Sequence, residues 1–279
     1  MLINGLTNDY KQIVEQKGIF GILEYEKDLS VSADNAYEQY FMSKMNVRRR
    51  QVIISLENDA CRMEAGALQW MVGNITVDTD VKDTSDFLGK VMKGAVTNES
   101  VVKPLYSGTG CIVLEPTYKF PIMIDVAEWG PQGVTISDGM YYASEKTVEV
   151  GIATRKNISS SILGGEGIFN VNLSGSGIAV LESEAPMTEL VEIELQNEEL
   201  RLDGKYAVCW STSLDFTVEK ATSTLAGSLV SKEGFLNVFR GTGKVWISPV
   251  ASYKSILNSS VGSQVQKVAK TAKNFIPFG

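Results

Sequence analysis

The stretch LSGSGIAVLE, residues 173–182, is repeated twice elsewhere in the chain, as YSGTGCIVLE from Tyr106 and as FRGTGKVWIS from Phe239. Each copy places a Gly-x-Gly directly before a run of apolar, largely β-branched residues, a pattern typical of a β-strand. Around the first two copies, residues 99–115 and 166–182 align without a gap at an offset of 67, with seven identities in 17 positions. We therefore predict an internally repeated, all-β protein.

A second pattern recurs between the Gly-x-Gly strands. Apolar and polar residues alternate and then reach an acidic residue one or two positions before a glycine, which favours a tight hairpin turn. The stretches run over residues 51–73, 120–144 and 190–210, and their acidic residues are Glu64, Asp138 and Asp203. The order of turn and Gly-x-Gly thus occurs three times, which predicts three β repeats, at 51–118, 119–186 and 187–250.

The predicted architecture has three tandem repeats of the β-sandwich or short double-stranded β-helix kind, related by pseudo-threefold symmetry. A repeat of about 65 residues buries too little surface to be stable alone, so the three should pack around one axis. Residues 1–50 are predicted as an N-terminal extension with a short helix. Residues 251–279 are predicted as a basic amphipathic tail.

Both predicted helices carry an apolar stripe. In residues 34–47 the stripe is Tyr37, Tyr40, Phe41 and Met45, which we expect to dock on the core. In the tail a helix is predicted over residues 261–276, with lysines off its stripe of Val261, Val265, Val268, Ala272 and Phe275. We expect this helix to dock within a homo-oligomer, and the alternatives are membrane binding, pairing with a partner helix or docking on the β body of its own chain.

Composition excludes several classes of chemistry. The 279 residues include no histidine and three cysteines, Cys61, Cys111 and Cys209, without a CxxC spacing. Catalysis by Ser-His-Asp or Cys-His and histidine-ligated metal sites are therefore excluded. The cysteines are interpreted as buried apolar residues. Because the N-terminus lacks the apolar core of a secretory signal, the expected location is the cytoplasm.

Charge is unevenly distributed. The net charge is −7, yet residues 251–279 carry four lysines and no acidic residue, which leaves 22 basic against 33 acidic groups in residues 1–250. Since phosphate backbones are bound by cations, nucleic acid is an unlikely partner for the acidic body. Membrane association is expected only through the tail. The arginine run at 48–50 is a candidate phosphate grip, although a solvated junction or a charged strand edge is favoured.

Other candidate sites each have a structural alternative that we favour. Glu64, Asp138 and Asp203 would converge on a threefold axis and hold Ca²⁺, but acidic turn chemistry explains them as well. The Gly-x-Gly pairs precede strands rather than helices, which favours a bulge or close strand packing over phosphate binding. Four tryptophans offer stacking surfaces for bases or sugars, but scattered strand positions favour a core role for Trp70, Trp129, Trp210 and Trp246.

In combination, three segments resemble the bacterial branch of the "altered inheritance of mitochondria, twenty-four" family. They are GALQWMVGNITV at 66–77, GGEGIFNVNLSGSGIAVL at 164–181 and GFLNVFRGTGKVWIS at 234–248. The resemblance covers roughly residues 50–250. It implies a triplicated body of the TRAP-like β fold with no established enzymatic activity. The fold's other namesake, the tryptophan-responsive RNA-binding attenuation protein, offers an analogy of fold alone, and none of its binding residues has a matching motif here.

We therefore predict a non-enzymatic scaffold or interaction protein, without catalytic, cofactor or metal-binding residues, that forms homo-oligomers and has a protein partner. The alternative is a module that binds RNA, another polyanion or a small molecule. A cupin-type enzyme ranks last, because cupin metal sites are usually built on histidines.

Overall fold

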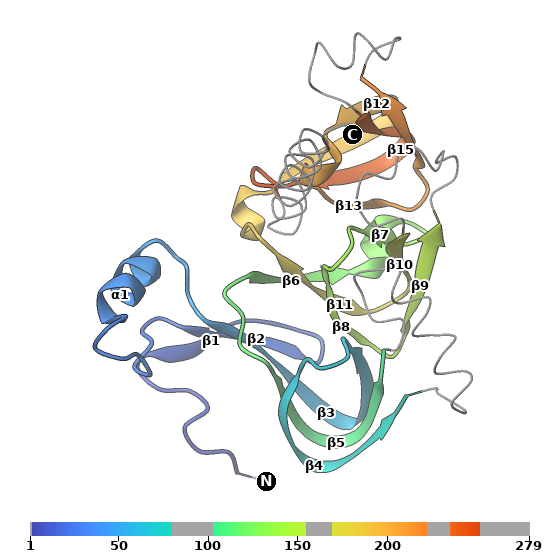
Figure 1. The fold of residues 1–279 in the computed structure, drawn as a ribbon. Coiled ribbons are helices and arrows are strands. Elements are labelled where there is room, and N and C mark those ends of the chain that lie inside the picture. Colours follow the sequence, from blue (N-terminus) through green and yellow to red (C-terminus); the bar gives the residue numbers. More distant parts are fainter. Residues whose placement is uncertain (1, 80–102, 155–168, 222–234, 252–279) are drawn as a thin grey trace, which may run out of the picture.

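The computed structural model describes residues 2–79, 103–154, 169–221 and 235–251 (Figure 1). Within these residues nearly all regular structure is strand, and the single α-helix is α1 (Ala36–Lys44). The first eight strands are β1 (Lys11–Lys17), β2 (Phe20–Tyr25), β3 (Arg50–Met63), β4 (Leu68–Asp78), β5 (Leu105–Leu114), β6 (Phe120–Asp125), β7 (Val134–Ile136) and β8 (Tyr141–Glu145). The others are β9 (Val148–Thr154), β10 (Phe169–Gly175), β11 (Ile178–Ser183), β12 (Val191–Leu202), β13 (Ala207–Ser211), β14 (Asp215–Lys220) and β15 (Phe235–Ile247).

The strands form two curled sheets. The eight-stranded sheet has the order β1-β2-β3-β8-β11-β6, with β5 on β3 and β4 on β5. The seven-stranded sheet has the order β12-β15-β13-β7-β10-β9, with β14 on β15. Figure 1 shows β3, β4 and β5 at one end of the molecule, β6 to β11 in the middle and β12 to β15 at the other end.

Apolar side chains of both sheets meet in one cluster, which holds the two sheets together. Ile122 and Ile124 of β6 are contributed by the first sheet, and Val134, Leu173 and Val208 by the second. All five are at most 5% exposed. Burial at this level is the main stabilising contribution, at roughly 1.5–3 kcal/mol for each large aliphatic side chain.

Two of the Gly-x-Gly motifs lie within strands, β5 and β15, that have strand partners on both sides. The third motif, at residues 175–177, lies where β10 ends and β11 begins. The strand β5 pairs with β3 and β4, and β15 pairs with β12 on one edge and with β13 and β14 on the other. In the middle of the chain the same role is divided between β10 and β11. At Gly108 φ is +140° and a Cβ atom would lie 2.0 Å from the Asn74 carbonyl oxygen. Close strand packing, the favoured interpretation, is thus confirmed at Gly108, and β5 and β15 run through their Gly-x-Gly motifs as strands, whereas a phosphate cradle is typical of a turn before a helix.

The middle residue of two Gly-x-Gly motifs holds a bulge on the neighbouring strand. Asn58 of β3 and Asn197 of β12 have φ of +53° and +61° and interrupt the strand register. The Asn58 N–H donates to Thr109 Oγ1 at 3.0 Å, and the Asn197 N–H donates to Thr242 Oγ1 at 3.1 Å. A bulge leaves an N–H without a ladder partner, and the threonine hydroxyl accepts it.

The predicted pseudo-threefold body is not confirmed. Among the described residues, no strand of 187–250 pairs with a strand of 51–118, so hydrogen bonding runs along the molecule rather than around an axis. The turn at Asp203 is also different from the prediction. A 3₁₀ turn, η3 (Gly204–Tyr206), replaces the two-residue hairpin turn.

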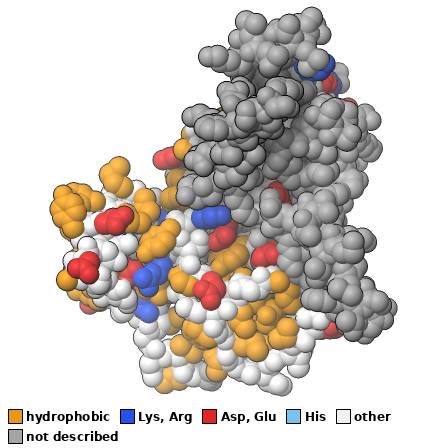
Figure 2. Space-filling model, viewed as in Figure 1, with side chains coloured by type: hydrophobic (Ala, Val, Ile, Leu, Met, Phe, Trp, Pro, Cys, Tyr) orange, Lys and Arg blue, Asp and Glu red, His pale blue; other side chains and the backbone are white. Residues whose placement is uncertain are grey.

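The helix α1 does not dock its apolar stripe. Tyr37 is 78% exposed and Met45 76% exposed, and α1 has no buried residue. Instead the aromatic rings contact one another, since Tyr37 and Phe41 lie edge to face with centroids 4.7 Å apart. Figure 2 shows hydrophobic side chains at the surface in the region of α1, and the exposed stripe means that the docking prediction is wrong.

Two further expectations concern helices. The predicted tail helix, 261–276, lies outside the described residues. In the part of the chain that the structure describes, no helix has the length and the apolar content needed to cross a bilayer.

Candidate functional site

A cleft of about 440 Å³ lies between β1 and β6, the first and last strands in the main order of the first sheet. One side is formed by residues of the β1–β2 hairpin and the other by residues 120–124. Trp129, Trp246 and residues 186–188 complete it. The sheet curls so far that its first and last strands face one another without pairing. Clefts of this size fit a small molecule or a few residues of a peptide.

The interior of the cleft is apolar and aromatic. Ile122, Trp129 and Trp246 are at most 7% exposed. The two indole rings pack edge to face with centroids 5.0 Å apart, which is a favourable arrangement for aromatic pairs and holds both rings in place. The Trp246 Nε1–H donates to Glu192 at 2.5 Å, so its polar atom is satisfied away from any ligand.

A buried ion pair closes the opposite side of the cleft. The guanidinium of Arg50, which is 4% exposed, donates from Nε to Glu24 Oε2 at 2.8 Å. Its other nitrogens donate to the Asn46 side chain at 2.9 Å and to backbone carbonyls. Burial lowers the pKa of Arg50, and Glu24 acts in the opposite direction. The guanidinium also lies 4.2 Å from the Phe120 ring centroid. Arg50 is therefore fully occupied as a structural cation.

Charges of both signs surround the mouth. Glu15 and Glu128 are exposed and Lys17 is half-buried. Thr188, also exposed, adds a hydroxyl. An apolar interior with a mixed polar rim is the arrangement of a binding site rather than of a charge-selective groove.

The cleft also presents backbone groups of β6. The Val126 N–H donates to the Gly177 carbonyl at 3.0 Å in the ladder that β6 forms with β11. Because antiparallel strands alternate their bonding direction, the Met123 amide and carbonyl and the Pro121 carbonyl point toward the other edge. Both residues line the cleft, and within the described ranges no strand pairs with this edge.

The cysteines are not available for covalent chemistry. All three are free and buried. Desolvation raises the pKa of Cys61 to about 12 and raises those of Cys111 and Cys209 as well. Since the thiolate is the nucleophile, these thiols are unreactive at neutral pH. Their interpretation as buried apolar residues is confirmed.

We expect the native protein to resist thiol reagents. At pH 8 an aromatic disulfide reagent should label none of the three cysteines within minutes, because labelling requires the chain to open. In guanidinium chloride all three should react at once. Stoichiometric labelling of one native thiol, located by peptide mapping, would contradict the burial described above.

The structure separates the predicted cation ligands. Glu64 forms an ion pair with Lys103. Across the described segments, no three Asp, Glu or Cys side chains are close enough to ligate a metal, so Glu64, Asp138 and Asp203 do not form a calcium site. The first two turns have the positive φ that tight turns favour, with Gly66 at +84° and Gly139 at +76°.

The arginine run at 48–50 is not a solvated junction, because its side chains pair with carboxylates of the same chain. Arg48 bonds Glu24 at 2.7 Å, and Arg49 pairs with Asp28. The acidic partners lie on β2 and just after it, and β2 pairs with the start of β3. The run GIFGILEYEK at 18–27, an apolar segment followed by acidic residues, was the signal for a strand opposite the arginines.

The tryptophans serve the core, as favoured. Trp210 packs against Phe216 and Phe239, with both ring centroids at 5.1 Å. Trp70 is half-buried and contacts a separate cluster around Leu23. No sequence signal indicated that Trp129 and Trp246, 117 positions apart, would meet beside a cleft.

Comparison with known proteins gives one family and one fold. A family model described as "Mitochondrial biogenesis AIM24" matches residues 44–250, more than half of the chain. The crystal structure of protein SPYM3_0169 from Streptococcus pyogenes has a TM-score of 0.54 and 20% sequence identity, and covers 82% of this chain and 94% of that one. This likeness shows a shared fold. No curated protein matches the chain significantly.

Proposed function

The chain belongs to the AIM24 family, and on this premise we propose that it is a non-enzymatic interaction protein whose β1–β6 cleft binds an extended segment of a protein partner. The observation that carries the proposal is the cleft itself. It combines an apolar interior with main-chain groups of β6 that lack a strand partner among the described residues. An added strand gains affinity from such main-chain groups and specificity from apolar pockets.

The non-enzymatic part of the proposal is supported by the chemistry of the described side chains. The chain has no histidine, and its three thiols have raised pKa values. Beside the cleft, Glu24 is held by two arginines. Turnover on a broad panel of metabolites, abolished by one carboxylate substitution, would contradict this part.

Binding of RNA or another polyanion has less support. Arg48, Arg49 and Arg50 are committed to carboxylates. The tail lysines lie outside the described residues, so they add nothing for or against it. A cytoplasmic location is part of the proposal, and cell fractionation tests it.

The test is site-specific photo-crosslinking from the cleft in cells. A benzophenone amino acid at Glu15, on the exposed rim, should capture one protein. Thr188→Trp, which fills the mouth, should remove that product and leave the melting temperature unchanged. The same probe at Ser213, exposed and away from the cleft, is the matched control.

Three outcomes contradict the proposal. Identical products from Glu15 and Ser213 would show nonspecific capture. A Glu15 product that survives Thr188→Trp would place the partner outside the cleft. An adduct with the mass of a lipid or metabolite would assign the cleft to a small molecule instead.

A further inference from the structure

Two short ladders of the same geometry join successive parts of the molecule. The end of β3 pairs with β8, and β7 pairs with the end of β13. The opposed residues are Cys61–Glu145, Arg62–Ser144 and Met63–Ala143 in the first ladder, and Val134–Ser211, Thr135–Trp210 and Ile136–Cys209 in the second. In the first ladder, β3 precedes the turn at Glu64 and β8 follows the turn at Asp138. In the second, β7 precedes the turn at Asp138 and β13 follows the turn at Asp203.

The flanking hydrogen bonds repeat as well. At one end of each ladder, an N–H that follows β3 or β7 donates to the carbonyl of the residue opposite. At the other end, an N–H that follows β8 or β13 donates back to the residue that precedes the ladder positions of β3 or β7. The four bonds are Glu64 N–H to Tyr142 at 2.8 Å, Ser137 N–H to Val208 at 3.0 Å, Lys146 N–H to Ala60 at 3.2 Å and Thr212 N–H to Gly133 at 3.0 Å. The two junctions therefore share register and bonding phase.

The Gly-x-Gly strands identify the third set of equivalent positions. Cys61 lies opposite Tyr106 and Leu200 lies opposite Phe239, each two residues before the first glycine of its motif. Residues 200–202 of β12 thus correspond to residues 61–63 of β3. The opposing strands β4, β8 and β13 are matched by a shared irregularity. In each, a one-residue shift in register comes just before the residue concerned, which is Trp70, Ala143 or Cys209. Residues 70–72 of β4 thus correspond to residues 143–145 and 209–211.

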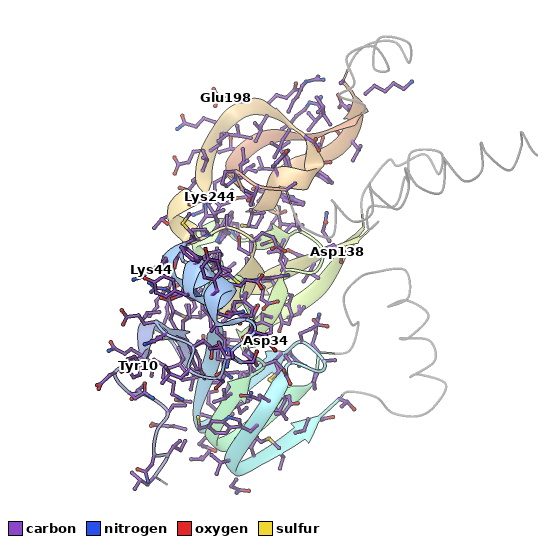
Figure 3. The ribbon with its side chains drawn as sticks, turned by 60° about the vertical axis from the view of Figure 1, so that its left-hand side comes forward. Tyr10, Asp34, Lys44, Asp138, Glu198 and Lys244 are labelled. Atoms are coloured by element: carbon purple, nitrogen blue, oxygen red, sulfur yellow. The ribbon has the colours of Figure 1, made fainter. Side chains whose placement is uncertain are left out.

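These third equivalents lie at opposite ends of the molecule. Figure 1 shows β4 at one end and β12 at the other, and Figure 3 places Glu198 of β12 far from Tyr10 of the N-terminal segment. Considering described residues only, β4 pairs with β5 alone and β12 with β15 alone. Met71 is 40% exposed, whereas its equivalents Ser144 and Trp210 are 0% and 3% exposed. The position that is buried in the inner ladders is therefore exposed on β4.

We propose that copies of this chain associate head to tail, with residues 200–202 of one copy pairing antiparallel with residues 70–72 of the next. The register follows from the two inner ladders and sets Leu200 opposite Val72, Arg201 opposite Met71 and Leu202 opposite Trp70. A second copy is the occupant because the chain already builds this ladder twice from equivalent strands. The contact is heterologous, so it closes a ring or extends a filament. It involves neither β1 nor β6 and is independent of the cleft.

The first test is cysteine crosslinking between separately prepared full-length variants. By analogy with the inner ladders, the Leu200 and Val72 pair is not hydrogen-bonded, so its Cβ atoms come within disulfide range. Mixed Leu200→Cys and Val72→Cys proteins should form a covalent dimer on mild oxidation. Leu200→Cys with Thr76→Cys, about 13 Å out of register, should not. Equal yields from the two mixtures would overturn the register.

The second test is charge. Met71→Arg places a cation directly opposite Arg201, and Met71→Glu is the matched substitution with the opposite sign. Sedimentation equilibrium should show association about tenfold weaker for Met71→Arg than for Met71→Glu. An intact chain that stays monomeric at all concentrations would overturn the proposal.

Hydrogen exchange distinguishes a second copy from another segment of the same chain. Amides of residues 70–72 and 200–202 should gain protection as protein concentration rises. Protection that does not depend on concentration would mean that the edges are covered within one chain, and it would also overturn the proposal.

Discussion

Gly108→Ala is expected to lower the free energy of unfolding by about 2–5 kcal/mol. The φ of +140° at Gly108 costs an L-residue about 1–2 kcal/mol. The new Cβ atom would also lie 2.0 Å from the Asn74 carbonyl oxygen, which is backbone and cannot rotate away. Forcing β4 and β5 apart adds an overpacking cost of about 1–3 kcal/mol. Urea denaturation followed by tryptophan fluorescence measures the change.

Gly241→Ala is the matched control. Gly241 is the first glycine of the last Gly-x-Gly and has φ of +117°, but its nearest neighbour is a flexible Leu214 carbon at 3.8 Å. Only the conformational cost applies, so about 1–2 kcal/mol is expected. Equal losses for the two variants would mean that close strand approach is not the reason for the glycine at 108.

The strands could be predicted from the sequence because their signals are local. Alternation and Gly-x-Gly marked β3, β5, β12 and β15, and the acidic turns marked where chain direction changes. The N-terminal hairpin was missed, since β1 has exposed apolar residues such as Val14 and its partner β2 is short. What decides β1 is pairing with β2, a tertiary effect.

The arrangement of the parts could not be predicted, since it depends on contacts between distant residues. A sequence repeat indicates equivalent units, but both a closed ring and an open row satisfy it. The observed linear arrangement follows from two ladders. Residues 61–63 of β3 pair with β8, and residues 134–136 of β7 pair with β13, so each part is joined to the next. Nothing in the spacing of the repeats indicates whether a third ladder closes within one chain.

The cleft was also beyond sequence reasoning. Its interior joins Ile122 of β6, Trp129 of the 3₁₀ turn at residues 126–129 and Trp246 of β15, and its opposite side depends on an ion pair between residues 24 and 50. An arginine run at the start of a strand is typical of an exposed, charged edge. The outcome differs because β2 brings Glu24 alongside and makes Arg50 a buried cation.

Arg50 and Arg48 both bond Glu24, but they differ in how far their side chains are buried. The side chain of Arg50 is 5% exposed and that of Arg48 is 30% exposed, although both bond Glu24 at under 3 Å. An exposed ion pair contributes roughly 0–1 kcal/mol. Loss of one partner of a buried pair costs about 3–5 kcal/mol, because an uncompensated charge stays in the interior.

Glu24→Ala is therefore expected to destabilise the fold by about 3 kcal/mol, at the low end of that range because Arg50 keeps the Asn46 side chain and backbone carbonyls as acceptors. Arg48→Met, the control, should cost less than about 1 kcal/mol. The double variant Glu24→Leu/Arg50→Met should recover much of the loss, because an apolar pair leaves no charge to desolvate. Chemical denaturation of the four proteins forms the measurement. If Glu24→Ala and Arg48→Met cost the same, Arg50 is solvated in solution and does not form the closed side of the cleft.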